Sequence, residues 1–216
     1  YFEYLPEGAP FRTDQMEKYR PWYHEFEECG YTFANPVCYT WYPTWSWYPE
    51  WANDDYRWFY NLLKVGSNAL RHTPREVPVI PWVHWHTTSQ PADTPPVPQM
   101  SEWAYQEFLW HLFLRGADGL MMWCTAEETV KEVSLINQVL GEALAYREFL
   151  DAGEPISFEV PRRPATVVSG LRLGDRVLVR RTDFGDYHGP VRRRVGEATI
   201  SIPACPGRCQ IISIER

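Results

Sequence analysis

The chain has 216 residues, of which 44% are hydrophobic, which is enough for a core in one large domain or in a domain and a half. Its net charge of −7 argues against the phosphate backbone of a nucleic acid as the partner. No run of about 18 apolar residues occurs, so no membrane-spanning helix is expected.

Aromatic residues are unusually frequent, with 11 Trp and 13 Tyr. Large aromatic side chains fill cores, and they also form flat platforms for ligands with apolar faces, such as sugar rings. Most of them should be packing residues. The five cysteines are an odd number, which does not describe a closed set of disulfides. Cys205 and Cys209 flank a tight turn and either pair or stay free, so the redox compartment remains open.

Over residues 1–153, strand-like and helix-like segments alternate. In chain order we expect a helix at residues 13–29, a strand at 31–40, a helix at 53–70, a strand at 77–86, a helix at 101–115, a strand at 120–124 and a long helix at 129–153. This order predicts a parallel sheet covered by helices. A barrel and a doubly wound sheet both fit, and the lack of a Gly-rich phosphate loop disfavours a nucleotide-binding sheet.

The pattern changes after Glu154, where short strands alternate with glycine-marked turns. We expect strands at residues 166–168, 176–180, 191–195, 198–203 and 210–214. Residues 154–216 are therefore predicted to form a small antiparallel β-sandwich that follows an α/β domain at 1–153. The run Arg192-Arg193-Arg194 is interpreted as a solvated strand edge.

The stretch from Gly116 to Trp123, GADGLMMW, resembles the strand that closes the barrel in many (β/α)₈ glycoside hydrolases, where a Gly-x-x-Gly turn leads into an apolar strand ending in Trp. Residues 30–150 are distantly similar to the hyaluronidase-type family, which also has a strand like that of residues 77–86. The resemblance implies the C-terminal portion of a TIM-type (β/α) barrel, with a β-sandwich behind it. It also implies a glycosidase that acts on a poly- or oligosaccharide.

In such barrels the active site lies at the C-terminal ends of the strands. Aromatic or imidazole side chains stand at all three expected strand ends. The candidate sugar-binding residues are Tyr39, Trp41, Tyr42, Trp82, His84, His86, Trp123 and Glu127. Because His84 and His86 are two residues apart on a strand, they should point the same way, with Trp82 below them.

Glycoside hydrolysis usually needs two carboxyl groups near the scissile bond. The resemblance implies Glu3 as the catalytic general acid, because the family's proton donor is a Glu in an Asp-x-Glu motif. This sequence has Tyr1 in place of that Asp, which puts the family's substrate-assisted mechanism in doubt. The alternative is that Glu3 is an exposed residue near the chain end.

Two histidines on one strand face can also chelate a divalent ion. Only one more strand follows, and it brings Cys124 but no further His, so neither a metal nor another cofactor is expected. Hydrogen bonds from the imidazoles to a sugar or to a neighbouring carboxylate are favoured instead.

The second functional hypothesis is a non-catalytic carbohydrate-binding protein with the same aromatic groove. Three βα units cannot close an eight-stranded barrel, and they would leave an open strand edge. We therefore expect another chain, or a segment preceding Tyr1, to complete the barrel, since the chain starts with neither Met nor a signal peptide.

Overall fold

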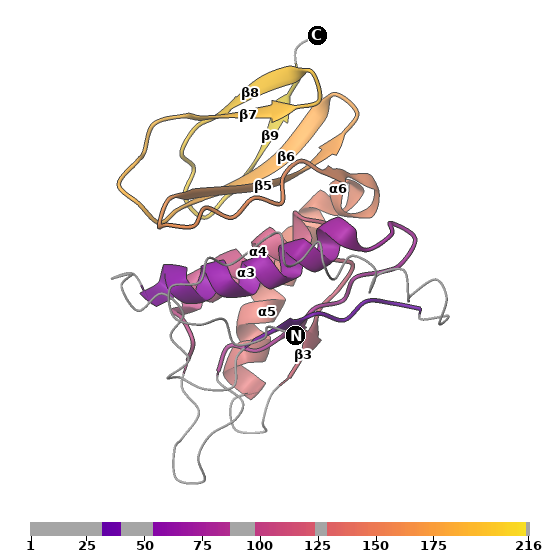
Figure 1. The fold of residues 1–216 in the computed structure, drawn as a ribbon, viewed down its shortest axis with the longest axis vertical. Helices are drawn as coiled ribbons and strands as arrows, with labels where there is room; N and C mark the ends of the chain where they lie inside the picture. Colours follow the sequence, from indigo (N-terminus) through magenta and orange to yellow (C-terminus); the bar gives the residue numbers. More distant parts are fainter. Residues whose placement is uncertain (1–31, 40–53, 87–97, 124–128, 215–216) are drawn as a thin grey trace.

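The structure is a computed structural model, and it describes residues 32–39, 54–86, 98–123 and 129–214. These residues form three layers, with antiparallel strands at one end, helices in the middle and short parallel strands at the other end (Figure 1). Helix and sheet are therefore mixed, as expected. None of the helices in these ranges is long and apolar enough to cross a membrane.

The parallel strands lie side by side in the order β1 (Val37–Cys38), β2 (Trp82–Val83) and β3 (Met121–Met122). They are much shorter than predicted. Before them, the first two segments are joined by the isolated bridge between Ala34 and Val79, where the Ala34 N–H donates to Pro78 O and the Ile80 N–H donates to Ala34 O. Proline explains the short strands, because Pro36, Pro78 and Pro81 have no N–H to donate to a neighbouring strand. Three parallel strands do not close a ring, so the predicted barrel is not seen in the described part of the chain.

Helices α3 (Asp54–His72) and α4 (Glu102–Phe113) occupy the middle layer, and α5 starts the C-terminal helical segment at Thr129–Ala143. Ser101, the first residue of the helix predicted at 101–115, is the N-cap of α4, since its hydroxyl accepts the Ala104 N–H at 3.2 Å. The long helix predicted to reach residue 153 is divided into α5, the 3₁₀ turn η1 (Leu144–Tyr146) and α6 (Arg147–Ala152). Nine residues of α4 are buried, because this helix is covered by a β layer as well as by its neighbouring helices.

The C-terminal part forms two antiparallel sheets. The first has the order β4 (Glu154–Pro155), β5 (Thr166–Leu173), β6 (Arg176–Asp183) and β9 (Cys209–Ser213), and the second pairs β7 (Val191–Val195) with β8 (Ala198–Ile202). An apolar core that includes Val177, Val179, Val195 and Ile200 joins the two sheets. The antiparallel β character predicted for this part is confirmed.

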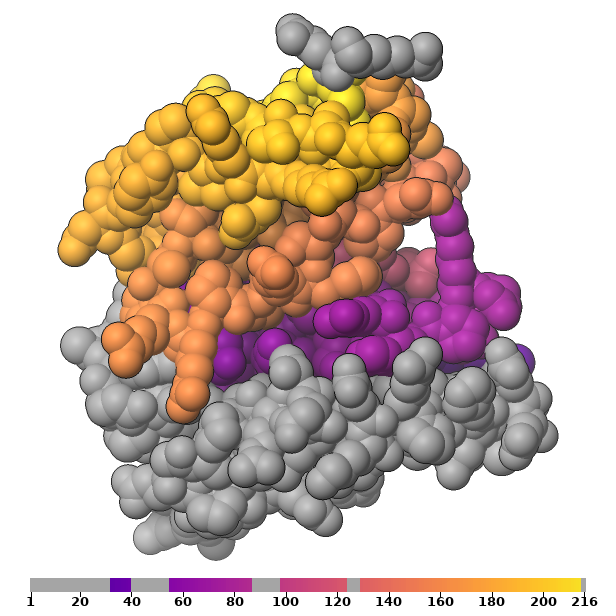
Figure 2. All heavy atoms as spheres, turned by 45° about the horizontal axis from the view of Figure 1, so that its top comes forward, coloured from indigo at the N-terminus to yellow at the C-terminus, as the bar shows by residue number. Residues whose placement is uncertain are grey.

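The other face of the first sheet packs on the helices, and Figure 2 shows the orange atoms of this C-terminal part lying against the purple atoms that include α3. Along β6 the side chains alternate, so that Leu178 joins the core of the helices while Val177 and Val179 join the core of the β7–β8 hairpin. Since both faces of β6 are covered, the C-terminal sheets and the helices form one packed body.

A chain of buried hydrogen bonds runs through the contact between α4 and this sheet. The Arg115 Nε–H donates to Ser169 Oγ at 2.8 Å, and Ser169 Oγ lies 2.7 Å from Nδ1 of His111. His111 Nε2 lies 2.9 Å from Thr182 Oγ1, whose hydroxyl donates to Glu107. Since Thr182 donates onward, it must accept from Nε2–H, and Nδ1 must accept from Ser169. The chain therefore fixes a neutral His111 with its proton on Nε2.

Among the cysteines of the described ranges, Cys38, Cys205 and Cys209 are free thiols. For the turn between Cys205 and Cys209 the structure thus favours free thiols over a disulfide. Burial raises the pKa of the Cys209 thiol to about 11, so this sulfur is a poor nucleophile at neutral pH.

Candidate functional site

The register of the parallel strands places three predicted site residues in one row. Val37 pairs with Trp82 and Trp82 with Met121, so the residues two positions further on are Tyr39, His84 and Trp123. The row is held at one side by the Trp123 N–H, which donates to Val83 O at 2.9 Å. These side chains therefore meet just past the C-terminal ends of β1, β2 and β3, as the sequence predicted.

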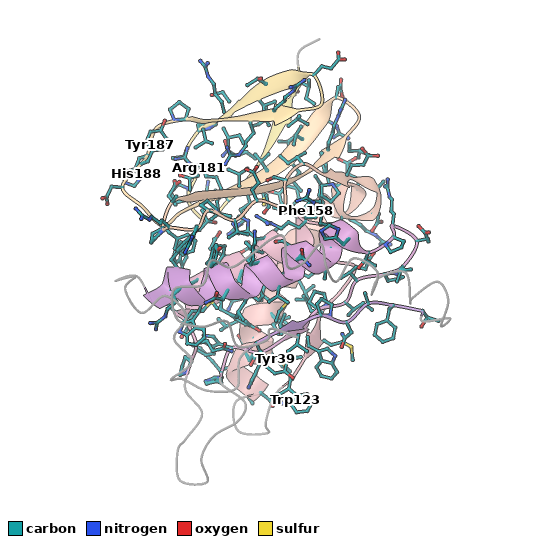
Figure 3. All side chains as sticks on the ribbon, in the orientation of Figure 1. Tyr39, Trp123, Phe158, Arg181, Tyr187 and His188 are labelled. Carbon is teal, nitrogen blue, oxygen red and sulfur yellow. The ribbon has the colours of Figure 1, made fainter. Side chains whose placement is uncertain are left out.

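Aromatic rings cover this row of residues. The rings of Tyr39 and Trp123 are stacked, with centroids 6.1 Å apart and planes 25° apart, and Figure 3 labels both below the long purple helix. Trp82 contacts the same indole, with centroids 5.5 Å apart. Trp123 nevertheless keeps 47% of its surface exposed, which leaves it free to contact a ligand.

The two histidines lie next to the aromatic rings. The ring centroids of His84 and His86 are 5.8 Å apart, and the rings of Tyr39 and His84 are nearly perpendicular, with centroids 6.3 Å apart. Their spacing of two residues puts both imidazoles on one side of the strand, as predicted. His84 is buried to 1% exposure, whereas His86 is half-buried.

The structure adds a residue that the sequence did not single out as a site residue, Glu132 of α5. Its side chain is fully buried, and Oε2 lies 2.8 Å from His84 Nδ1. Oε1 accepts the Tyr105 hydroxyl at 2.6 Å and the Trp85 N–H at 3.0 Å. Through these contacts the carboxylate fixes residues 84 and 85, which follow β2.

The segment of His84, Trp85 and His86 that follows β2 is also fixed by the residues just before α4. Gln99 Nε2 donates to the carbonyl oxygens of both His84 and His86, each at 2.9 Å. The indole N–H of Trp85 donates to Met100 O at 2.7 Å. Backbone and side chains of residues 84–86 are therefore positioned by Glu132 of α5 and by the segment that precedes α4, as a binding or catalytic site requires.

The predicted site residues divide into two groups. Tyr39, Trp82, His84, His86 and Trp123 come together at one end of the parallel strands. The other candidates, Glu3, Trp41, Tyr42 and Glu127, lie outside the described residues. The sequence analysis missed Glu132 because this residue follows His84 by 48 residues. Its role becomes visible only in the folded structure, where its carboxylate lies beside His84.

The arrangement offers apolar ring faces, imidazole nitrogens and one buried carboxylate to a ligand. His84, His86 and Glu132 each present one ligand atom, and these atoms all lie within 4.8 Å of one another. Burial raises the pKa of the Tyr39 phenol, so this side chain stays neutral and can donate a hydrogen bond at ordinary pH.

Comparisons of this chain with models of known protein families, with curated proteins and with solved structures found no match. Its function is therefore inferred from the residues of the site and their geometry.

Proposed function

We propose that the protein is a glycoside hydrolase, or the C-terminal portion of one, that binds a poly- or oligosaccharide at the ends of its parallel strands. The observation that carries this proposal is the stacked pair of Tyr39 and Trp123, with Trp82 against the same indole. A half-exposed indole beside hydrogen-bonding imidazoles suits a sugar, which has apolar C–H faces and hydroxyl edges.

Each group has a role in this proposal. The exposed part of Trp123 contacts the C–H face of a sugar ring, while His84 and His86 exchange hydrogen bonds with its hydroxyl groups. Glu132 accepts from His84 Nδ1 and so sets which imidazole nitrogen faces the sugar. The parallel strands would belong to a TIM-type (β/α) barrel, whose active sites lie at this end of the strands. A preceding segment or another chain would supply the remaining strands.

The catalytic carboxyl groups would come from outside the described residues, with Glu3 as the proposed general acid and Glu127 at the sugar. Glu132 is unsuited to donate a proton to a leaving group. It is fully buried, and its two oxygens already contact Tyr105, Trp85 and His84.

The second candidate is a carbohydrate-binding protein without hydrolytic activity. One observation favours it: within the described ranges, the carboxylate in contact with the histidines is Glu132, whose surroundings stabilise the strand end. The aromatic groove would then hold the sugar without a working acid pair.

Sugar binding is tested by Trp123→Ala, measured by fluorescence titration with oligosaccharides of hyaluronan, chitin and cellulose. Loss of one aromatic platform should weaken binding about tenfold, or roughly 1.4 kcal/mol. Trp103→Ala is the matched control, because Trp103 is 46% exposed and lies on α4 against Phe184. Binding that is absent in the unaltered chain, or equal in the two variants, would contradict the proposal.

The two candidate functions are separated by Glu3→Gln, assayed for release of reducing ends from the same oligosaccharides. A hydrolase that uses Glu3 as its acid loses turnover and keeps binding. A chain that binds sugar but shows no turnover even before the substitution is the carbohydrate-binding protein.

A further inference from the structure

We propose that His84, His86 and Glu132, the His-His-Glu cluster, bind a divalent transition metal ion of the zinc type. Their ligand atoms lie within 4.8 Å of one another, and all three side chains are buried or half-buried. Two imidazoles and a carboxylate are a set of protein ligands that suits zinc, with a fourth position left for water or a substrate oxygen. This site goes beyond the proposed function and does not depend on it; a bound ion would take the imidazole nitrogens, and the sugar would then be bound by the aromatic rings.

The sequence alone disfavoured a metal because it offered only two ligands. The structure supplies the third, since α5 carries Glu132 to the end of β2, where Oε2 stands 2.8 Å from His84 Nδ1. The ligands therefore come from one strand end and one helix. At bond lengths near 2.0–2.1 Å, two ligand atoms of a tetrahedral ion stand about 3.3 Å apart, so this pair needs to separate only slightly.

The two carboxylate oxygens of Glu132 have different partners, and this arrangement fits a metal ligand. Oε1 is held by the Tyr105 hydroxyl and the Trp85 N–H, whereas Oε2 faces the imidazole. Hydrogen bonds of this kind orient ligands around protein-bound metals. Trp85 lies between the two histidines in the chain, so one hydrogen bond fixes the carboxylate relative to both of them.

Charge and burial favour the ion as well. Glu132 has no exposed surface and His84 has 1%, and a buried carboxylate is costly unless it is paired or coordinates a cation. His86 is half-buried and follows β2, whose neighbour β3 is followed by the exposed Trp123, so this partly exposed histidine is the ligand through which the cluster reaches the surface.

The test uses the whole chain, freed of metal with a chelator, and titrates it with Zn²⁺ against a chromophoric competitor. We expect one tightly bound equivalent, and with Co²⁺ an absorption band in the visible range that indicates tetrahedral coordination. His86→Gln and Glu132→Gln remove ligands and should abolish the tight equivalent. Tyr105→Phe removes only a supporting hydrogen bond and should weaken binding about tenfold or more.

His188→Gln is the matched control, because His188 is an exposed histidine of the C-terminal part and its loss should leave the tight equivalent unchanged. The proposal would be overturned if the unaltered chain bound no more Zn²⁺ than the His86→Gln variant. This outcome depends on the unaltered chain, so it holds whether or not the variant folds well. In that case the hydrogen bond between His84 and Glu132 is the whole function of the cluster. Since neither titration contains sugar, this result leaves the proposed sugar site untouched.

Discussion

Glu107 of α4 and Arg180 of β6 form a buried ion pair with two hydrogen bonds. Arg180 Nε lies 2.9 Å from Oε2 of Glu107, and Nη2 lies 2.5 Å from Oε1. The side chains are only 3% and 5% exposed, and the guanidinium also lies over the ring of Trp110 at 4.6 Å. This pair ties the middle helices to the C-terminal sheet.

Removing one member of this pair should be strongly destabilising, because the other charge is then buried without compensation. We expect Glu107→Leu to lower the free energy of unfolding by about 3–5 kcal/mol in urea titrations. The double variant with Arg180→Leu should lose less than the sum of the single losses. Simple additivity of the two losses would show that the residues do not interact in the folded protein.

The buried His111 makes stability depend on pH. Burial, with Arg115 and Arg180 nearby, holds the pKa of His111 well below its ordinary value of 6.5. As the pH falls below about 6.5, the His111 side chain is therefore protonated in the unfolded chain but stays neutral in the folded chain. The contribution of His111 to the free energy of unfolding is fully present above this pH. At lower pH this contribution decreases, by at most about 1.4 kcal/mol per pH unit.

The contribution of His111 is measured by comparing the unaltered chain with His111→Gln at about pH 7.5 and about pH 5.5. The unaltered chain should lose about 1 kcal/mol more than the variant over this interval. Equal losses would mean that His111 takes up its proton in the folded state.

Two glycines in helices should respond oppositely to alanine. A Cβ at Gly66 of α3 would stand 2.4 Å from Leu112 Cδ2 and 3.5 Å from Cys38 Sγ, so Gly66→Ala should cost about 1–3 kcal/mol. A Cβ at Gly141 of α5 would meet nothing within 4 Å, so Gly141→Ala should stabilise by about 0.5–1 kcal/mol. Thermal unfolding of both variants checks the close approach of α3 to α4.

Cutting the chain after Gly153 should not leave a stable fragment. The cut removes Arg180, Ser169 and Thr182, the partners of Glu107 and His111 in α4. It also uncovers the apolar side of the helices that packs against β5 and β6. We expect residues 1–153 to aggregate or to lack a cooperative unfolding transition. A soluble fragment with a sharp transition would show that the two parts fold independently.

The predictions from sequence succeeded best where local signals agree. The strand Val191–Val195 has its predicted bounds, and α4 starts directly after Ser101, the first residue of its predicted range. The parallel strands were predicted too long, because an apolar run signals burial but not pairing, and Pro78 and Pro81 interrupt the hydrogen-bonding edge of that run.

Only part of the candidate site was predicted from the sequence, because local patterns were sufficient for some residues and tertiary packing decides the others. Period-two alternation was enough to place His84 and His86 on one side, and the parallel register brought Tyr39 and Trp123 beside them. Glu132 was not predicted as a site residue because its role depends on how α5 packs against the end of β2. Sequence spacing does not encode that packing. A buried polar chain such as that from Arg115 to Glu107 is likewise a property of tertiary contacts.

The coverage of β6 limits where the C-terminal part can meet other molecules. Val177 to Thr182 are six consecutive residues that are all buried, so neither broad side of the sheet is open at this strand. A ligand or partner of this part must therefore approach its loops, its edge strand β9 or the outer side of the β7–β8 hairpin, where Arg192 and Arg194 are exposed. Recognition of a ligand on the broad face of β6 is therefore excluded in the folded protein.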